Sequence, residues 1–194
     1  SAEVRTMSND IYSNSIIQQI IYSSAAVPIT LVSASSATAD KIIFAEDVDG
    51  IDPTLSLGRT QNILLNPGTP EKLFVVLPGQ TFAGGHPRGK LGNPSVITAG
   101  QEFTATVALT DAYFNPTPNY SVTVSATSPM DDYDTEPQTA DIELATGKKQ
   151  FLFTLVTAST AHYIVARDVD GVPPLYQEYP ANAEDFAVST FTVG

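Results

Sequence analysis

Hydrophobic and polar residues alternate along much of this chain with the two-residue period of a β-strand. The clearest stretch is Glu102–Thr110, in which Phe103, Ala105, Val107 and Leu109 alternate with Thr and Ala. Successive side chains of a strand point to opposite faces, so this pattern predicts a strand with one face in a core.

Further strands are predicted where short apolar or alternating segments lie between turn residues. These segments are residues 15–22, 72–77, 120–126, 140–144, 150–156, 161–167 and 186–193. Gly, Pro, Asn and Asp between them mark turns. No segment keeps a 3.6-residue period with helix caps. The sequence therefore predicts an all-β fold, and seven strands after residue 69 favour an immunoglobulin-like β-sandwich.

Three short motifs occur twice and in the same order, which indicates an internal duplication. Residues 10–14 (DIYSN) match residues 111–115 (DAYFN), residues 30–35 (TLVSAS) match 154–159 (TLVTAS), and residues 43–50 (IFAEDVDG) match 164–171 (IVARDVDG). The separations are 101, 124 and 121 residues. A single match has little weight, but three in one order argue for two related copies.

The spacing of these matches predicts two unequal domains. We expect a first immunoglobulin-like domain at residues 1–68 and a second at residues 69–194, with a Pro- and Gly-rich boundary between them. The first match places Ser1 near Glu102, and it makes the first copy 23 residues shorter around residues 129–150. The first domain is therefore predicted to be incomplete at its N-terminal side, without a counterpart of residues 69–101.

Composition excludes several classes of function. The chain has no cysteine, which excludes disulfides, thiolate metal sites and cysteine nucleophiles. Its net charge of −12 repels phosphate backbones, so we expect no nucleic-acid partner. The longest apolar runs have the length of a strand, and we therefore expect no membrane insertion.

Several turns and strands of the second copy follow one another in a recognisable order. Gly100 precedes the strand at residues 103–109, the turn DAYFNP follows at residues 111–116, and Thr-Gly-Lys at residues 146–148 precedes two further strands. These features resemble the bacterial immunoglobulin-like repeats of invasin- and intimin-type surface proteins, which have a filamin-like sandwich. The resemblance implies an extracellular or cell-surface location and tandem, non-enzymatic modules whose partners are copies of the chain or neighbouring repeats.

Two aspartate turns at equivalent positions are candidate calcium sites. Their residues are Asp47, Asp49 and the nearby Asp52 in the first copy, and Asp168 and Asp170 in the second. Carboxylates spaced beside a Gly turn supply the oxygen ligands that calcium prefers. The alternative is that Asp and Gly end a strand and begin a turn. No other cofactor is expected.

Residues 84–90 (GGHPRGK) match a phosphate-binding loop up to its last position. Leu91 stands where that loop needs Ser or Thr, and Pro87 removes one backbone amide, which favours an ordinary loop. His86 and His162 have no helix-spaced partner, and no Gly-x-Ser-x-Gly motif marks a nucleophile. We therefore do not expect an enzyme.

Two features suggest contacts with sugars. Asn119 begins the sequon Asn-Tyr-Ser and is a candidate glycosylation site. The second feature is a set of aromatic residues. They can form a face that binds a glycan or a protein, or they can pack in cores and turns. That set contains Tyr113, Phe114, Tyr120, Tyr176 and Tyr179.

The incomplete first domain carries the functional expectation. A sandwich without its first strand exposes unpaired backbone groups, which a strand from a neighbouring molecule can satisfy. Head-to-tail repetition of that contact gives an open fibre. We therefore expect a structural module of an extracellular filament or surface layer. The alternatives are an adhesin or carbohydrate-binding module, and a longer repeat array whose preceding residues supply the strand.

Overall fold

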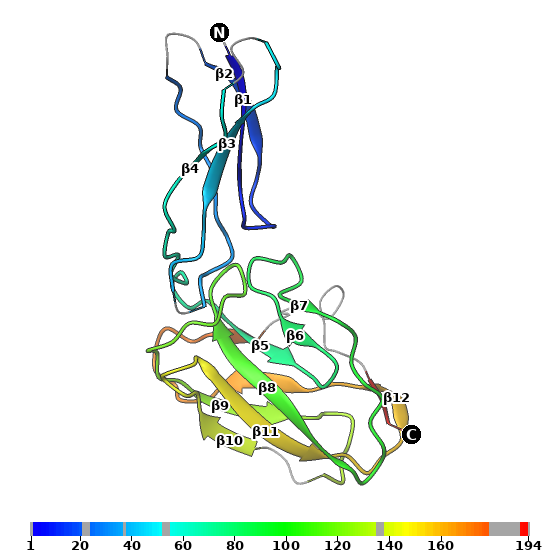
Figure 1. Ribbon diagram of the computed structural model, residues 1–194. Coiled ribbons are helices and arrows are strands. Elements are labelled where there is room, and N and C mark those ends of the chain that lie inside the picture. The colour runs from blue at the N-terminus through cyan, green and yellow to red at the C-terminus, as the bar shows by residue number, and fades with distance from the viewer. Residues whose placement is uncertain are drawn as a thin grey trace. The chain divides into compact units, whose positions relative to one another are not determined.

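The computed structural model describes residues 2–20, 24–36, 38–51, 55–134, 138–178 and 191–193, and its regular structure is entirely β-strand (Figure 1). The predicted all-β class is therefore confirmed. The chain divides into two compact units, Ser1–Asn66 (unit 1) and Pro67–Gly194 (unit 2). Nowhere in the described ranges is there a helix with the length and apolarity needed to cross a bilayer.

Unit 2 contains two sheets, one in the order β11-β8-β5-β14 and the other in the order β10-β9-β13. The strands are β5 (Lys72–Val76), β8 (Glu102–Thr110), β9 (Thr123–Thr127), β10 (Gln138–Asp141), β11 (Lys148–Thr154), β13 (Val165–Asp168) and β14 (Gln177–Glu178). Among the described strands of unit 2, only β14 runs parallel to its neighbour, β5. A hairpin of β6 (Thr81–Phe82) and β7 (Lys90–Leu91) and the pair β12 (Ser159–His162) and β15 (Phe191–Val193) complete the unit.

The predicted strands agree with these elements to different degrees. The segment Glu102–Thr110 is β8, with the bounds that the alternation gave. The predicted strand at residues 161–167 is instead two strands, because β12 pairs with β15 whereas β13 pairs with β9. Residues 186–190 of the last predicted strand lie outside the described residues.

One core of sixteen buried apolar residues joins the two sheets of unit 2. Seven of them come from residues 73–109, namely Leu73, Leu77, Ile97, Phe103, Ala105, Val107 and Leu109. The other nine come from residues 122–166, namely Val122, Val124, Ala126, Ile142, Phe151, Phe153, Leu155, Ile164 and Ala166. Both chain segments are thus required to bury this core.

The opposite face of β5 is also buried. Phe74 and Val76 form a second cluster with Phe114, and Phe82 of the β6–β7 hairpin packs against it. The rings of Phe74 and Phe114 lie 4.9 Å apart. A strand covered on both faces is apolar at consecutive positions, which explains why residues 72–77 form an apolar run rather than an alternation.

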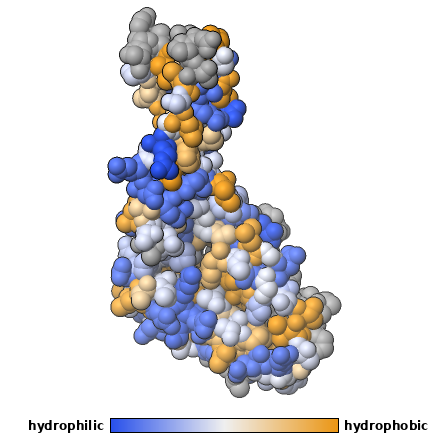
Figure 2. All heavy atoms as spheres, viewed as in Figure 1, coloured by the Kyte–Doolittle hydropathy of each residue, from blue (hydrophilic) through white to orange (hydrophobic). Residues whose placement is uncertain are grey.

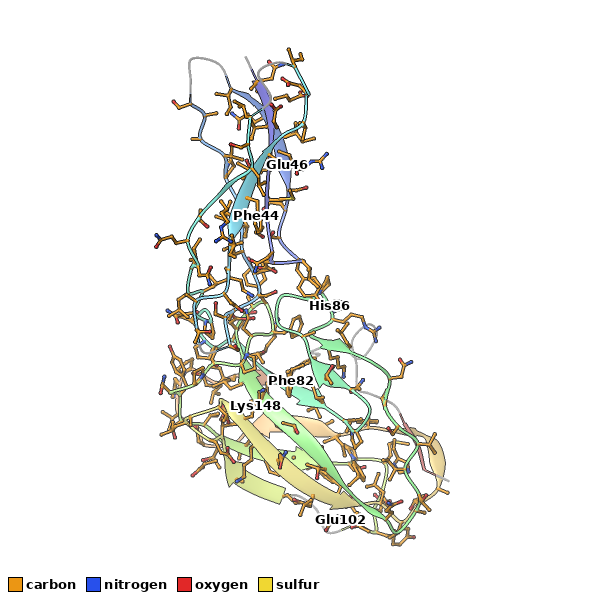
Figure 3. All side chains as sticks on the ribbon, in the orientation of Figure 1. Phe44, Glu46, Phe82, His86, Glu102 and Lys148 are labelled. Carbon is orange, nitrogen blue, oxygen red and sulfur yellow. The ribbon has the colours of Figure 1, made fainter. Side chains whose placement is uncertain are left out.

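Unit 1 contains a single four-stranded antiparallel sheet in the order β2-β1-β3-β4. Its strands are β1 (Ala2–Ser8), β2 (Ile16–Ile20), β3 (Ile43–Asp47) and β4 (Gly58–Arg59). Glu46, labelled on β3 in Figure 3, forms an ion pair of 3.1 Å with Arg5 of β1. The only buried residues among those described in unit 1 are polar: Thr6, Asp10 and Lys41. Unit 1 therefore has no apolar core of its own within the described residues.

The three strands β2-β1-β3 repeat the arrangement of β10-β9-β13. In both units a central strand pairs antiparallel with the next strand and with a later one. Val4 lies opposite Asp47 in unit 1, and Val124 lies opposite Asp168 in unit 2. This shared register aligns the two units at separations of 120 to 122 residues.

Candidate functional site

Asp10 of unit 1 holds a distant segment of the same unit through its carboxylate. Oδ2 accepts the backbone N–H groups of Val32 and Ser33, at 2.7 and 2.8 Å. Oδ1 accepts the hydroxyl of Ser33 at 2.8 Å and the N–H of Tyr12 at 3.2 Å. Burial alone would raise the pKa of Asp10, but these hydrogen bonds to the charged form outweigh it and lower the pKa.

Asp131 of unit 2 has the same partners at the same atoms. Oδ2 accepts the N–H groups of Val156 and Thr157, at 2.6 and 3.0 Å. Oδ1 accepts the hydroxyl of Thr157 at 2.9 Å and the N–H of Tyr133 at 3.3 Å. Burial again opposes the shift, and the hydrogen bonds again lower the pKa. We call each arrangement the aspartate clamp of its unit.

These clamps correct the alignment expected from the sequence. Asp10 corresponds to Asp131 and not to Asp111, whose carboxylate accepts the N–H groups of Gly68 and Asn115 instead. The turns look alike because all three aspartates accept the N–H of a tyrosine two residues later. The span from clamp aspartate to held segment then differs by only three residues between the units, not by 23. On this alignment the described residues of unit 1 correspond to parts of unit 2 that follow residue 121, so β5 and β8 have no counterpart among them.

The first predicted calcium turn is occupied by backbone donors. Asp49 accepts the N–H of Ile51 at 3.0 Å and that of Glu3 at 2.8 Å. Asp47 accepts the N–H of Asp49 at 3.3 Å and that of Leu55 at 2.9 Å. The hydrogen bond from Ile51, followed by that from Glu3, lowers the pKa of Asp49. The two carboxylates thus tie the loop after β3 to β1.

The second predicted calcium turn repeats this scheme. Asp170 accepts the N–H of Val172 at 2.7 Å and that of Thr123 at 3.4 Å. Asp168 accepts the N–H of Asp170 at 3.2 Å and that of Tyr176 at 3.0 Å. Backbone N–H groups that point at a carboxylate favour its charge and would repel a cation, so the contacts support the turn interpretation. No three acidic, His or Cys side chains among the described residues are grouped to hold a metal, and Asp52 lies outside those residues.

We expect excess calcium to leave the melting temperature of the chain unchanged relative to EDTA, because a ligand stabilises only when it binds the folded state. Differential scanning calorimetry in the two buffers measures this. A calcium-dependent rise that is absent in Asp49→Asn would contradict the turn interpretation and support a calcium site.

Residues 84–89 lie in the connection of the β6–β7 hairpin and Lys90 begins β7, so this segment does not form a phosphate cradle. The N–H of Gly85 donates to the carbonyl of Tyr113, and the N–H of Gly89 donates to that of His86. Lys90 is buried, and its Nζ donates to the carbonyl of Val75 at 3.3 Å. Two of the glycine amides and the lysine that a phosphate would need are therefore used within unit 2.

Lys90 gives unit 2 a pH-dependent stability. Burial, with a smaller contribution from Arg88, lowers the pKa of Lys90 to about 8. The pKa of an unfolded lysine is about 10.4, so between these values the unfolded state binds more protons and stability rises with pH. We expect the melting temperature to rise from neutral pH toward about pH 9.5, and to rise less in Lys90→Met. Equal rises in both proteins would contradict this account.

The predicted aromatic residues do not form one exposed face. Phe114 is buried, and Lys72 Nζ lies 3.9 Å from the centroid of its ring. Tyr176 packs against the core of unit 2, whereas Tyr113 and Tyr120 are exposed. Tyr179 lies outside the described residues.

The candidate sequon residue Asn119 is exposed in a turn with a positive φ of 70°. Its N–H donates to the carbonyl of Leu144 at 2.7 Å. Of the histidines, His162 is fully buried with Nε2 2.6 Å from the carbonyl of Thr157. The Nδ1 atom of His86 accepts the N–H of Arg88.

No known family model matches this chain, and no curated protein sequence matches it either.

The feature that sequence reasoning located only roughly is a set of nine positions in unit 1, six on its sheet and three within residues 27–31, whose apolar side chains stay partly exposed. The nine core residues of unit 2 from residues 122–166 all have counterparts in unit 1, and eight of these are apolar. They are Ala2, Val4, Thr6, Ile20, Val27, Ile29, Leu31, Ile43 and Ala45, which we call the open face. The apolar eight are half-buried, whereas their counterparts in unit 2 are at most 4% exposed.

These side chains stay partly exposed because the described residues of unit 1 lack the core residues that cover the equivalent positions in unit 2. The seven core residues of unit 2 from residues 73–109 have no counterpart in unit 1. Figure 2 shows apolar side chains at the visible surface of unit 1, the upper part of that view. An apolar face normally packs against a second layer, and no strand among the described residues of unit 1 supplies one.

Proposed function

We propose that this protein is a non-catalytic structural module of an extracellular filament or cell-surface layer. In this proposal both units are immunoglobulin-like, and the incomplete unit 1 is completed by a β-strand from a neighbouring molecule. The open face of unit 1 is the observation that carries the proposal.

The open face supports assembly because an uncovered sheet is costly. Full burial of a Val, Leu or Ile side chain contributes about 1.5–3 kcal/mol relative to full exposure. The six Val, Leu and Ile residues of the open face are half-buried, so each would gain a part of this. A sheet also exposes unpaired amides and carbonyls at its edge, which templates the addition of another strand. A partner that covers both features gains this energy on binding.

The repeated clamps support the modular part of the proposal. Both units use the same aspartate clamp. Both also have the same pair of aspartates, at the end of β3 in unit 1 and at the end of β13 in unit 2. Such repetition is typical of tandem arrays, in which each repeat is one structural unit. Because the candidate acidic groups bind backbone amides, they serve the fold rather than chemistry.

Sedimentation velocity of the purified chain at increasing concentration, followed by electron microscopy of the native material, tests the proposal. We expect association that increases with concentration and linear particles with a regular axial repeat. A chain that stays monomeric at high concentration, from cells whose surface carries no such particles, would rule the proposal out.

The second candidate is an adhesin or carbohydrate-binding accessory module, which the exposure of Tyr113 (50%), Tyr120 (40%) and Tyr133 (80%) favours. Aromatic rings at a surface stack on sugars and on protein partners. Binding on a glycan array that is lost in Tyr113→Ala or Tyr120→Ala would support this candidate instead.

A further inference from the structure

We propose that residues 24–31 of unit 1 are the receptor for the incoming strand, which pairs antiparallel with them in the register that β8 takes on β11. This inference rests on the proposed function, because it specifies where and how the neighbouring molecule binds. The argument uses unit 2 as the template for the completed state of unit 1.

The aspartate clamps fix the equivalence of the two segments. Asp10 holds Val32 as Asp131 holds Val156, so residues 24–31 correspond to residues 148–155. In unit 2 this segment is β11, which pairs with β8 from Lys148 opposite Ala108 to Thr154 opposite Glu102. In unit 1 the same segment forms no strand, although its side chains alternate between exposed and half-buried from residue 26 to residue 31.

The backbone directions identify the free edge. In unit 2 the carbonyls of Gly147 and Leu155 accept N–H groups from Leu109 and Gly100, on the side where β8 lies. Alternate residues of a strand point their backbone groups to the same edge, so odd-numbered residues of this segment face β8.

The equivalent residues of unit 1 are Val27, Ile29 and Leu31, which are also odd-numbered. Within the part of unit 1 that the structure describes, none of these three has a backbone hydrogen bond to another residue. Unpaired backbone groups at a strand edge are the recognition element for strand addition. The free edge of unit 1 is thus the edge that β8 covers in unit 2.

Pro28 is compatible with this pairing. It corresponds to Leu152, whose carbonyl accepts the side-chain amide of Gln138 and therefore points away from β8. The carbonyl of Pro28 likewise accepts the side-chain amide of Asn14, at 3.4 Å. A proline lacks an N–H donor, but at this position the missing donor faces away from the incoming strand.

The open face also sets the side chains that the strand must carry. In unit 2 Phe103 packs on Phe153 with ring centroids 5.9 Å apart, and Ala105 lies opposite Phe151. Unit 1 has Ile29 in place of Phe153 and Val27 in place of Phe151, and both side chains are smaller. The incoming strand therefore needs an apolar residue at every second position, as β8 has, and it has room for a side chain larger than alanine opposite Val27.

The occupant is an extended segment with this alternation from outside residues 1–194, and the proposed function takes it from a neighbouring molecule. The β8 strand of the same chain is not available, because Phe103, Ala105, Val107 and Leu109 are buried in unit 2. Taking β8 out of that core would expose all four side chains, so a separate strand is the lower-energy partner.

Binding of a labelled peptide with the sequence of Glu102–Thr110 to the full chain tests the inference by fluorescence anisotropy. We expect saturable binding, weakened about tenfold or more by Ile29→Asp, which places a charge against the apolar side of the strand. Thr30→Asp is the matched control, because it adds the same charge at the neighbouring exposed position and should bind as the unchanged chain does. Circular dichroism checks that both variants remain folded.

The register has a separate readout, since the chain contains no cysteine. Ile29→Cys should form a disulfide with the peptide carrying Phe103→Cys, which lies directly opposite, and much less with Thr104→Cys, whose side chain points to the other face. Equal cross-linking of the two peptides would overturn the register.

The outcomes also separate this inference from the proposed function. A chain that assembles into filaments but ignores the peptide would overturn the strand receptor and leave the structural function standing. Peptide binding by a chain that never assembles would support the receptor and contradict the filament. Self-association through two open faces, lost in Ile29→Asp but not displaced by the peptide, would also overturn the receptor.

Discussion

Replacing Phe153 by alanine is expected to lower the free energy of unfolding of unit 2 by about 3–5 kcal/mol, the range for removing a large aromatic side chain from a packed core. Phe153 is 1% exposed and stacks on Phe103, so its removal leaves a cavity lined by both sheets. Urea unfolding followed by circular dichroism measures the change.

The equivalent substitution in unit 1 is the matched control. Ile29→Ala is expected to lower the free energy of unfolding by clearly less, about 1–2 kcal/mol, because its side chain is only half-buried. Similar losses at the two positions would show that unit 1 has a closed core and would contradict the open face.

Replacing Asp131 by asparagine is expected to destabilise unit 2 by roughly 2–3 kcal/mol, because the clamp loses its charge and one of its two acceptor oxygens. The backbone N–H groups of Val156 and Thr157 then lose the charged Oδ2 acceptor that they share. Asp132→Asn removes a neighbouring exposed carboxylate and should leave the melting temperature unchanged.

The same clamp predicts a loss of stability in acid. The folded-state pKa of Asp131 lies below its unfolded value, so its contribution is present above the unfolded pKa of about 3.9 and is lost as the pH falls through the folded pKa. The melting temperature should therefore fall less steeply below about pH 4 in Asp131→Asn than in the unchanged chain. An equally steep fall in both proteins would place the acid sensitivity elsewhere.

Local patterns predicted many of the strands, but not β1, β3 and β4 of unit 1 or the two-residue strands β6, β7 and β14. The alternation at Glu102–Thr110 gave β8 with its bounds, and the Asp-Val-Asp-Gly motifs gave the turns that follow β3 and β13. Each of these features depends on residues that are neighbours in sequence, so their periodicity and turn chemistry are visible without the fold.

The equivalence of Asp10 was not visible in this way. Three turns of the chain begin with an aspartate two residues before a tyrosine, at Asp10, Asp111 and Asp131. The best local match selected Asp111, but the distant partners, Val32 and Val156, select Asp131. A side chain that caps a segment more than 20 residues away leaves no periodic trace between the two.

The sequence by itself determined that this chain is all-β, and it predicted many of the strands and two related copies of unequal completeness. Only the tertiary structure showed how Asp10 and Asp131 each hold a distant segment of their own unit. It also placed Phe114 and Lys90 inside unit 2 and joined the carboxylates of both aspartate turns to the backbone. The physical reason is that periodicity records which face of a strand is buried, whereas the partner that buries it comes from elsewhere in the chain. Residues 24–31 have the pattern of a core strand, and only the fold shows that no strand among the described residues of unit 1 pairs with them.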